Sequence, residues 1–182
     1  MIFKMLKKES NQFYCRAWLL WISLSFVFAI VVVHDNGIIN SSFMVKAPTV
    51  ATALEASKYG LFLIDILVLG LIPFKVAPLL PAFLAASNIS IFFLKSIIAL
   101  LSGHIIGGVV GFLLVADTVM LSATYLLMAN NLYASFRDYR QYRYELGYFT
   151  QWILAVKDTI YQFRVNFLIT FVIYLLLLML IK

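Results

Sequence analysis

Residues 87–133 read SNISIFFLKSIIALLSGHIIGGVVGFLLVADTVMLSATYLLMANNLY, an apolar stretch with few polar interruptions. A helix that crosses the hydrocarbon core of a bilayer needs about 20 such residues. The stretch therefore predicts two crossings rather than one. Their connection is expected near residues 103–108, and a position near Asp117 and Thr118 is the alternative.

Three glycines compete with the preferred connection. Gly103, Gly107 and Gly111 are spaced by four residues, so on one continuous helix they would form a smooth stripe. Stripes of small residues let two helix backbones approach closely in lipid, and these glycines are therefore candidates for helix packing. A turn and a stripe cannot both occupy all of residues 103–111, and the sequence leaves the choice open.

The composition of the whole chain is that of a membrane protein. Of its 182 residues 64% are hydrophobic and 12% are charged, and the mean hydropathy is +0.99. Soluble domains are about half apolar and about a quarter charged, and a short soluble chain leaves much of its surface in water. We therefore predict an all-α, polytopic integral membrane helical bundle that forms a single domain and is surrounded by the lipid bilayer.

About five helices are expected to cross the membrane. The predicted spans are residues 14–34, 60–86, 88–105, 108–133 and 163–181. An extramembrane loop of residues 35–59 follows the first span. The second span contains Pro73, Pro78 and Pro81. Proline inside a helix removes a backbone hydrogen bond, so this span is expected to be bent or divided into two half-helices.

Basic residues predict which ends of the spans face the cytoplasm. Lys4, Lys7 and Lys8 precede the first span, and residues 134–164 carry more basic than acidic side chains. Cytoplasmic loops are enriched in lysine and arginine. Both regions, and with them the N-terminus, are therefore expected in the cytoplasm, and the C-terminus outside it. A bacterial inner membrane and an organellar membrane fit this pattern equally.

The cytoplasmic segment, residues 134–164, also contains apolar side chains with helical spacing. They are Phe149, Trp152, Ile153, Val156, Ile160 and Phe163. This spacing predicts an amphipathic helix that lies along the cytoplasmic leaflet as an interfacial helix. Packing of the same face against the bundle or a partner protein is an equal alternative. Aromatic side chains between Tyr133 and Phe149, interleaved with arginines, predict an aromatic belt with basic anchors at the membrane surface.

Four ionisable residues fall inside the predicted spans, where charge is costly and often functional. They are Asp65, Lys75, Lys95 and Asp117. With turns near Ala85 and Ile106, the last three lie at a similar depth. The sequence favours a purely structural ion pair between packed helices, or a lysine that bends its head to the interface. The alternative is that Asp117 pairs with one lysine and leaves the other beside a cavity or substrate path.

The chain carries none of the common catalytic motifs, such as H-E-x-x-H, G-x-S-x-G or a P-loop, and no enzyme is expected. His34 and His104 have no partner at metal-ligand spacing, so neither a metal nor another cofactor is expected. The basic residues flank apolar spans, which argues against nucleic acid as a partner.

Two functions remain as hypotheses. The first is a non-enzymatic subunit of a larger membrane assembly of transport or secretion type, bound to other membrane proteins or forming a homo-oligomer. The alternative is a small self-standing transporter or channel that uses Lys75, Lys95 and Asp117.

Overall fold

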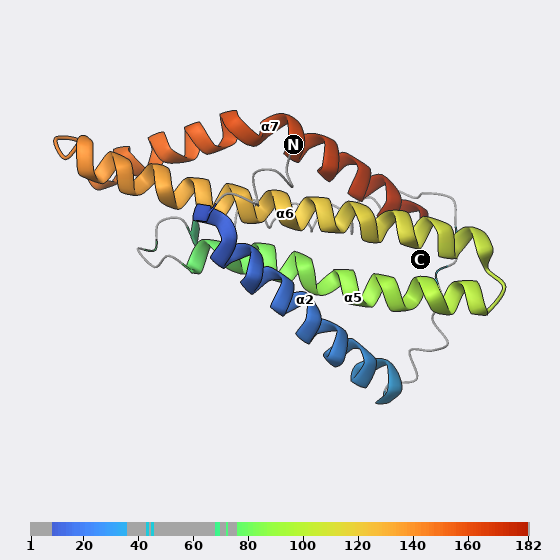
Figure 1. Ribbon diagram of the computed structural model, residues 1–182. Coiled ribbons are helices and arrows are strands. Elements are labelled where there is room, and N and C mark those ends of the chain that lie inside the picture. Colours follow the sequence, from blue (N-terminus) through green and yellow to red (C-terminus); the bar gives the residue numbers. More distant parts are fainter. Residues whose placement is uncertain are drawn as a thin grey trace.

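The computed structural model describes residues 9–35, 43, 45, 68–69, 72 and 76–181, and these residues are almost entirely helical. The elements are α2 (Glu9–Asp35), η3 (Ala77–Leu79), α5 (Leu80–Leu101), α6 (Ile105–Tyr142) and α7 (Tyr148–Leu180). Four of them, α2, α5, α6 and α7, are long and apolar enough to cross a membrane (Figure 1). The predicted class, a helical membrane protein, is confirmed at this level.

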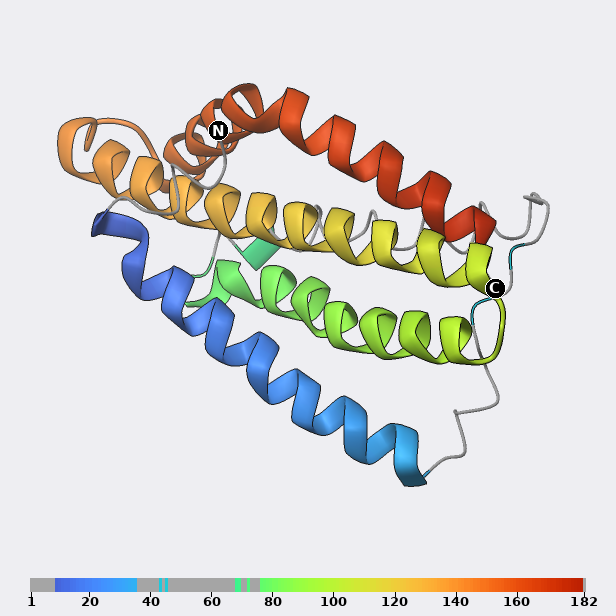
Figure 2. The same ribbon diagram turned by 45° about the vertical axis from the view of Figure 1, so that its right-hand side comes forward.

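The four long helices form a bundle in which neighbours in sequence are neighbours in space. α5 and α6 make one antiparallel hairpin, and α6 and α7 make a second (Figures 1 and 2). α2 packs against α5 and runs in the same direction as α5. Trp21 of α2 donates a hydrogen bond from Nε1 to Ser87 Oγ of α5 at 2.9 Å and stacks on Phe83.

Small side chains let α5 and α6 approach closely. α5 buries alanines and serines on the side that faces α6, and α6 buries Gly107, Gly108 and Gly111. A Cβ atom at Gly108 would collide with the side chain of Leu100, and one at Gly111 would collide with Ser96 Oγ and the ring of Phe43. The interface therefore depends on glycine at these positions.

The turn between α5 and α6 lies at residues 102–104, the first of the two places that the sequence offers. Gly103 has a φ of 81°, the left-handed conformation that favours glycine. The His104 N–H donates to the Ala99 carbonyl at 2.8 Å and the Gly103 N–H to the Leu100 carbonyl at 3.1 Å, which is a Schellman helix ending. Gly103 thus makes the turn, Gly108 and Gly111 meet α5, and Gly107 is buried.

The expected turn near Ala85 is wrong. α5 runs without a break from Leu80 to Leu101, so the boundary between predicted spans 60–86 and 88–105 falls in the middle of one helix. The prolines explain the error. Pro81 occupies the first turn of α5, where the fixed φ of proline suits a helix start. It therefore marks a helix start, not a kink inside a span.

The last helix also differs from the expectation. A separate interfacial helix followed by a span was predicted, but α7 is one helix of 33 residues from Tyr148 to Leu180. Most of predicted span 60–86 before η3, including Asp65 and Lys75, lies outside the described residues, as does most of loop 35–59.

Candidate functional site

α6 and α7 are longer than a membrane crossing requires. α6 has 38 residues, which at a rise of about 1.5 Å each gives about 57 Å. A bilayer is about 40–45 Å thick with its headgroups. The turn between α6 and α7 also lies beyond the first residues of α5 in both views (Figures 1 and 2). We name residues 130–164, which carry most of the polar side chains of these two helices, the hairpin.

Polar side chains join the two helices of the hairpin at two levels. Asn131 donates from Nδ2 to Gln162 Oε1 at 2.9 Å and accepts at Oδ1 from Thr159 Oγ1 at 3.0 Å. Further toward the turn, the Tyr139 hydroxyl donates to Asp158 Oδ2 at 2.5 Å. These contacts match polar groups of α6 with polar groups of α7, which fixes the register between the helices.

The turn at the tip is held by Gln151. Its Nε2 donates to the Arg143 carbonyl at 2.9 Å and to the Leu146 carbonyl at 2.8 Å. These carbonyls lie just beyond the end of α6, where helix geometry supplies no donor. The ring of Phe136 packs edge-on against Tyr148, with centroids 5.0 Å apart. The tip is therefore an ordered structure.

The buried side of α7 in the hairpin is not the apolar face that the spacing predicts. Gln151, Ala155, Thr159 and Phe163 are buried. Of the predicted apolar face, Phe163 is thus inward and Trp152 is half-buried. Val156 is also half-buried and packs against the core. The outer members are Phe149, Ile153 and Ile160, which we name the α7 stripe; exposure is 60% for Phe149, 47% for Ile153 and 40% for Ile160. Packing of the whole face against the bundle is therefore wrong.

The α7 stripe lies beside basic side chains. A shallow depression between successive turns of α7 is lined by Ile153, Val156 and Ile160 together with Lys157 and Arg164. The Arg164 guanidinium lies 4.4 Å from the centroid of the Tyr161 ring. Apolar side chains flanked by cations are typical of surfaces that bind a membrane interface or an acidic amphipathic partner.

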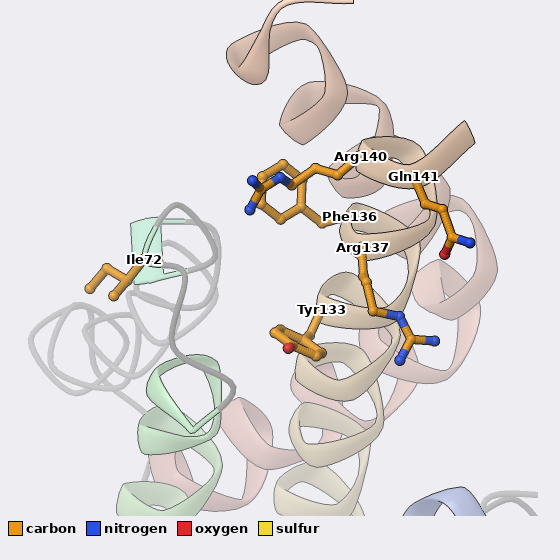
Figure 3. A pocket seen from close by; sticks show the side chains of 6 residues that line it. All are labelled: Ile72, Tyr133, Phe136, Arg137, Arg140 and Gln141. Carbon is orange, nitrogen blue, oxygen red and sulfur yellow. The ribbon is translucent and has the colours of Figure 1, made fainter. Parts of the chain in front are cut away.

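A second surface lies on α6 at the same end of the bundle. It is a groove of about 290 Å³ lined by Ile72, Tyr133, Phe136, Arg137, Arg140 and Gln141, which we name the arginine groove. Figure 3 shows Phe136 and Arg140 on the side of α6 toward Ile72, with Arg137 and Gln141 on the other side. Arg137 forms an ion pair with the adjacent Asp138 at 3.6 Å, and both side chains are mostly exposed.

The structure does not bring Lys95 and Asp117 together. The Lys95 ammonium lies 5.7 Å from the centroid of the Phe43 ring. Asp117 is 9% exposed, and its Oδ2 atom has no hydrogen-bond partner among the described residues. The reason is the position of the turn between α5 and α6. It is centred on Gly103 and not on Ile106, which shifts the residue opposite Asp117 by about six positions, or about 9 Å along the helix.

Tyr139→Phe is expected to lower stability by about 1 kcal/mol at neutral pH, because it removes the hydrogen bond to Asp158. That hydrogen bond raises the pKa of Tyr139 above its usual value of 10.0. A group whose pKa rises on folding contributes stability that is complete below the unfolded pKa and is lost as the pH passes the folded value. The difference between wild type and variant should therefore hold up to about pH 9 and shrink above about pH 10.

Thermal unfolding in a mild detergent measures this difference. Tyr142→Phe is the matched control, because the Tyr142 side chain is 74% exposed on the same helix. Equal loss of stability in the two variants would contradict the role of the Asp158 contact.

The sequence interpretation missed Asn131, Gln151 and Thr159, the residues that hold the hairpin together. A signal was present, since Asn131 ends the long apolar run and Gln151 and Thr159 are spaced by eight residues on one helical face. Comparison of the chain with protein-family models, with curated proteins and with solved structures finds no match, so any function has to be argued from these residues.

Proposed function

We propose that this chain is a non-enzymatic subunit of a larger integral membrane assembly, which it joins through the α7 stripe of the hairpin. The single observation that carries the proposal is the exposure of Phe149, Ile153 and Ile160 on a rigid hairpin that extends beyond the length of a membrane crossing. Exposed apolar side chains that are held in a fixed arrangement mark interaction surfaces.

The order of the hairpin supports a docking role. Hydrogen bonds from Asn131, Tyr139 and Gln151 hold the two helices and the turn in one conformation. A surface that is ordered before binding loses little conformational entropy when a partner docks. The inner face of α7 already contacts α6, so the α7 stripe is an apolar surface that this helix leaves exposed within the hairpin.

We further propose five crossings, with the hairpin in the cytoplasm. α2 and α5 run in the same direction, so the chain between them has to return (Figures 1 and 2). Val45 pairs with Ile181 at the end of α7, whereas Ile72 lines the arginine groove at the opposite end of the bundle. The chain between Val45 and Ile72 therefore connects the two ends of the bundle, as a return crossing requires.

Stoichiometric purification tests the proposed function. The full-length chain is isolated from its own membrane in a mild detergent, beside a variant with Phe149→Ser, Ile153→Ser and Ile160→Ser. The wild type is expected to carry partner proteins in fixed ratio, and the variant to lose at least about 90% of them, since about 1.4 kcal/mol is a tenfold loss of affinity.

The control is Tyr142→Ser with Tyr144→Ser, because these side chains are as exposed on the same hairpin but lie outside the α7 stripe. The control should retain the partners. A wild-type chain that travels alone, or a stripe variant that keeps its partners, would remove the basis of the proposal.

A small self-standing transporter is the second candidate, and it is favoured by one observation. Asp117 is buried within a predicted span and has an oxygen without a partner among the described residues. Ionisable groups in this position often lie on substrate or proton paths. Solute or proton flux into proteoliposomes of the pure protein, abolished by Asp117→Asn, is the result that this candidate requires.

A further inference from the structure

We propose that the arginine groove binds the phosphate headgroups of anionic phospholipids in the leaflet at the hairpin end of the bundle. This site lies on α6, away from the α7 stripe, and does not depend on the proposed assembly. Its ligand would be an anionic lipid such as a phosphatidylglycerol, not a soluble anion.

The depth of the groove matches the headgroup layer. Tyr133 lies 28 residues after Ile105, the first residue of α6, which corresponds to about 42 Å along the helix. A bilayer with its headgroups is about 40–45 Å thick, so Tyr133 falls at its edge. Arg137 and Arg140 lie one and two turns further, and long arginine side chains bend back toward the phosphates.

The groove offers hydrogen-bond donors that suit phosphate. The Arg137 and Arg140 guanidiniums, the Gln141 amide and the Tyr133 hydroxyl can all donate. Arginine binds phosphate with paired N–H groups, which lysine cannot do. Ile72, at 38% exposure, supplies apolar surface for the glycerol and the first carbons of the acyl chains, and Phe136 is buried beneath the groove.

The arrangement of the two arginines indicates two headgroups and not one. In Figure 3, Arg140 extends toward Ile72 while Arg137 extends to the other side of α6. Each guanidinium can therefore meet a different lipid. Asp138 is the acidic group nearest to Arg137, at 3.6 Å, and this exposed pair can open in favour of a phosphate because surface ion pairs are weak.

Lipid-dependent thermal stability tests the site. The full-length protein in a nonionic detergent receives either phosphatidylglycerol or phosphatidylcholine. A ligand that binds the folded state raises the melting temperature, and we expect a rise of about 4 °C with phosphatidylglycerol relative to phosphatidylcholine at about tenfold excess over the dissociation constant. The Arg137→Gln, Arg140→Gln double variant is expected to lose this difference.

Arg143→Gln is the matched control, since the Arg143 guanidinium lies over the Tyr139 ring on the same hairpin, outside both the groove and the α7 stripe, and should leave the lipid difference unchanged. Inorganic phosphate at millimolar concentration is the third arm. An equal rise with phosphate would assign the site to a soluble anion and overturn the lipid proposal, as would a double variant that keeps the full lipid response.

A second measurement tests the proposal on the wild type alone, in case the double variant fails to fold. Native mass spectrometry of the wild type counts lipids that stay bound after detergent removal. Up to two phosphatidylglycerol molecules per chain, retained over phosphatidylcholine, are expected from the two guanidiniums. Equal retention of the two lipids would overturn the proposal.

Discussion

Gly111→Leu is expected to lower the stability of the folded chain by about 3 kcal/mol, the upper part of the range for overpacked sites. Even a Cβ atom at this position would collide with Ser96 Oγ, and the ring of Phe43 would be 2.8 Å away. The further leucine carbons have no space unless α5 and α6 separate. For a chain of this size the loss corresponds to about 6–12 °C in melting temperature, measured by thermal unfolding in a mild detergent.

Val109→Leu is the control for this variant. Val109 lies on the same helix with 52% exposure, so the larger side chain enters lipid and not the α5–α6 interface. Little change is expected there. If Gly111→Leu melted with the wild type, the close packing of α5 on α6 at this level would be wrong.

The glycines show how far the sequence could predict this interface. Their spacing predicts a stripe, and the length of the apolar run predicts a turn. In the structure Gly103 takes the positive φ that ends α5, Gly107 and Gly111 remain helical, and the glycines that meet α5 are Gly108 and Gly111. The division between the two roles depends on one backbone conformation, which spacing alone does not determine.

The boundary of α5 could not be predicted in the same way. A proline inside an apolar run indicates a kink if the helix began earlier and a helix start if it did not. The run is apolar on both sides of Pro81, so hydropathy does not separate these cases. Packing decides it, since Ala82, Ala85 and Ala86 bury one continuous face of α5.

The hairpin shows a different limit of sequence reasoning. An amphipathic pattern identifies the apolar face but not its neighbour. In the hairpin, α7 lies beside polar groups. The Asn131 amide of α6 needs a hydrogen-bond partner, and the carbonyls of Arg143 and Leu146 need donors. α7 therefore turns Gln151 and Thr159 inward, and part of its apolar face stays exposed.

The predicted depth of the intramembrane charges depends on where the turn between α5 and α6 lies. When the turn between α5 and α6 moves by three residues, the position on α5 that lies opposite Asp117 moves by twice that number. The predicted neighbour of Asp117 is then a different residue. Residue types at a given depth are thus predictable only to within one or two helical turns. Asp65 and Lys75 lie outside the described residues.

The resulting environment of Asp117 gives the second large effect. A buried polar atom without a hydrogen-bond partner costs about 1–3 kcal/mol. Asp117 Oδ2 has no such partner in the part of the chain that the structure describes, so Asp117→Ala is expected to raise stability by about that amount.

Substitution of the neighbouring Thr118 is expected to change stability in the opposite direction, so the two variants test the interpretation together. Thr118 is 1% exposed and donates from Oγ1 to the Leu114 carbonyl at 2.7 Å. Thr118→Ala removes that hydrogen bond and a methyl group, and it should lower stability by about 1 kcal/mol. Thermal unfolding of both variants in detergent shows whether the two changes in stability differ in sign.

If Asp117→Ala instead lost about 3–5 kcal/mol, the carboxylate would have a cationic partner, since breaking a buried ion pair has that cost. Combining Asp117→Ala with Lys95→Ala identifies that partner: additive effects exclude Lys95, as the separation of the two residues requires.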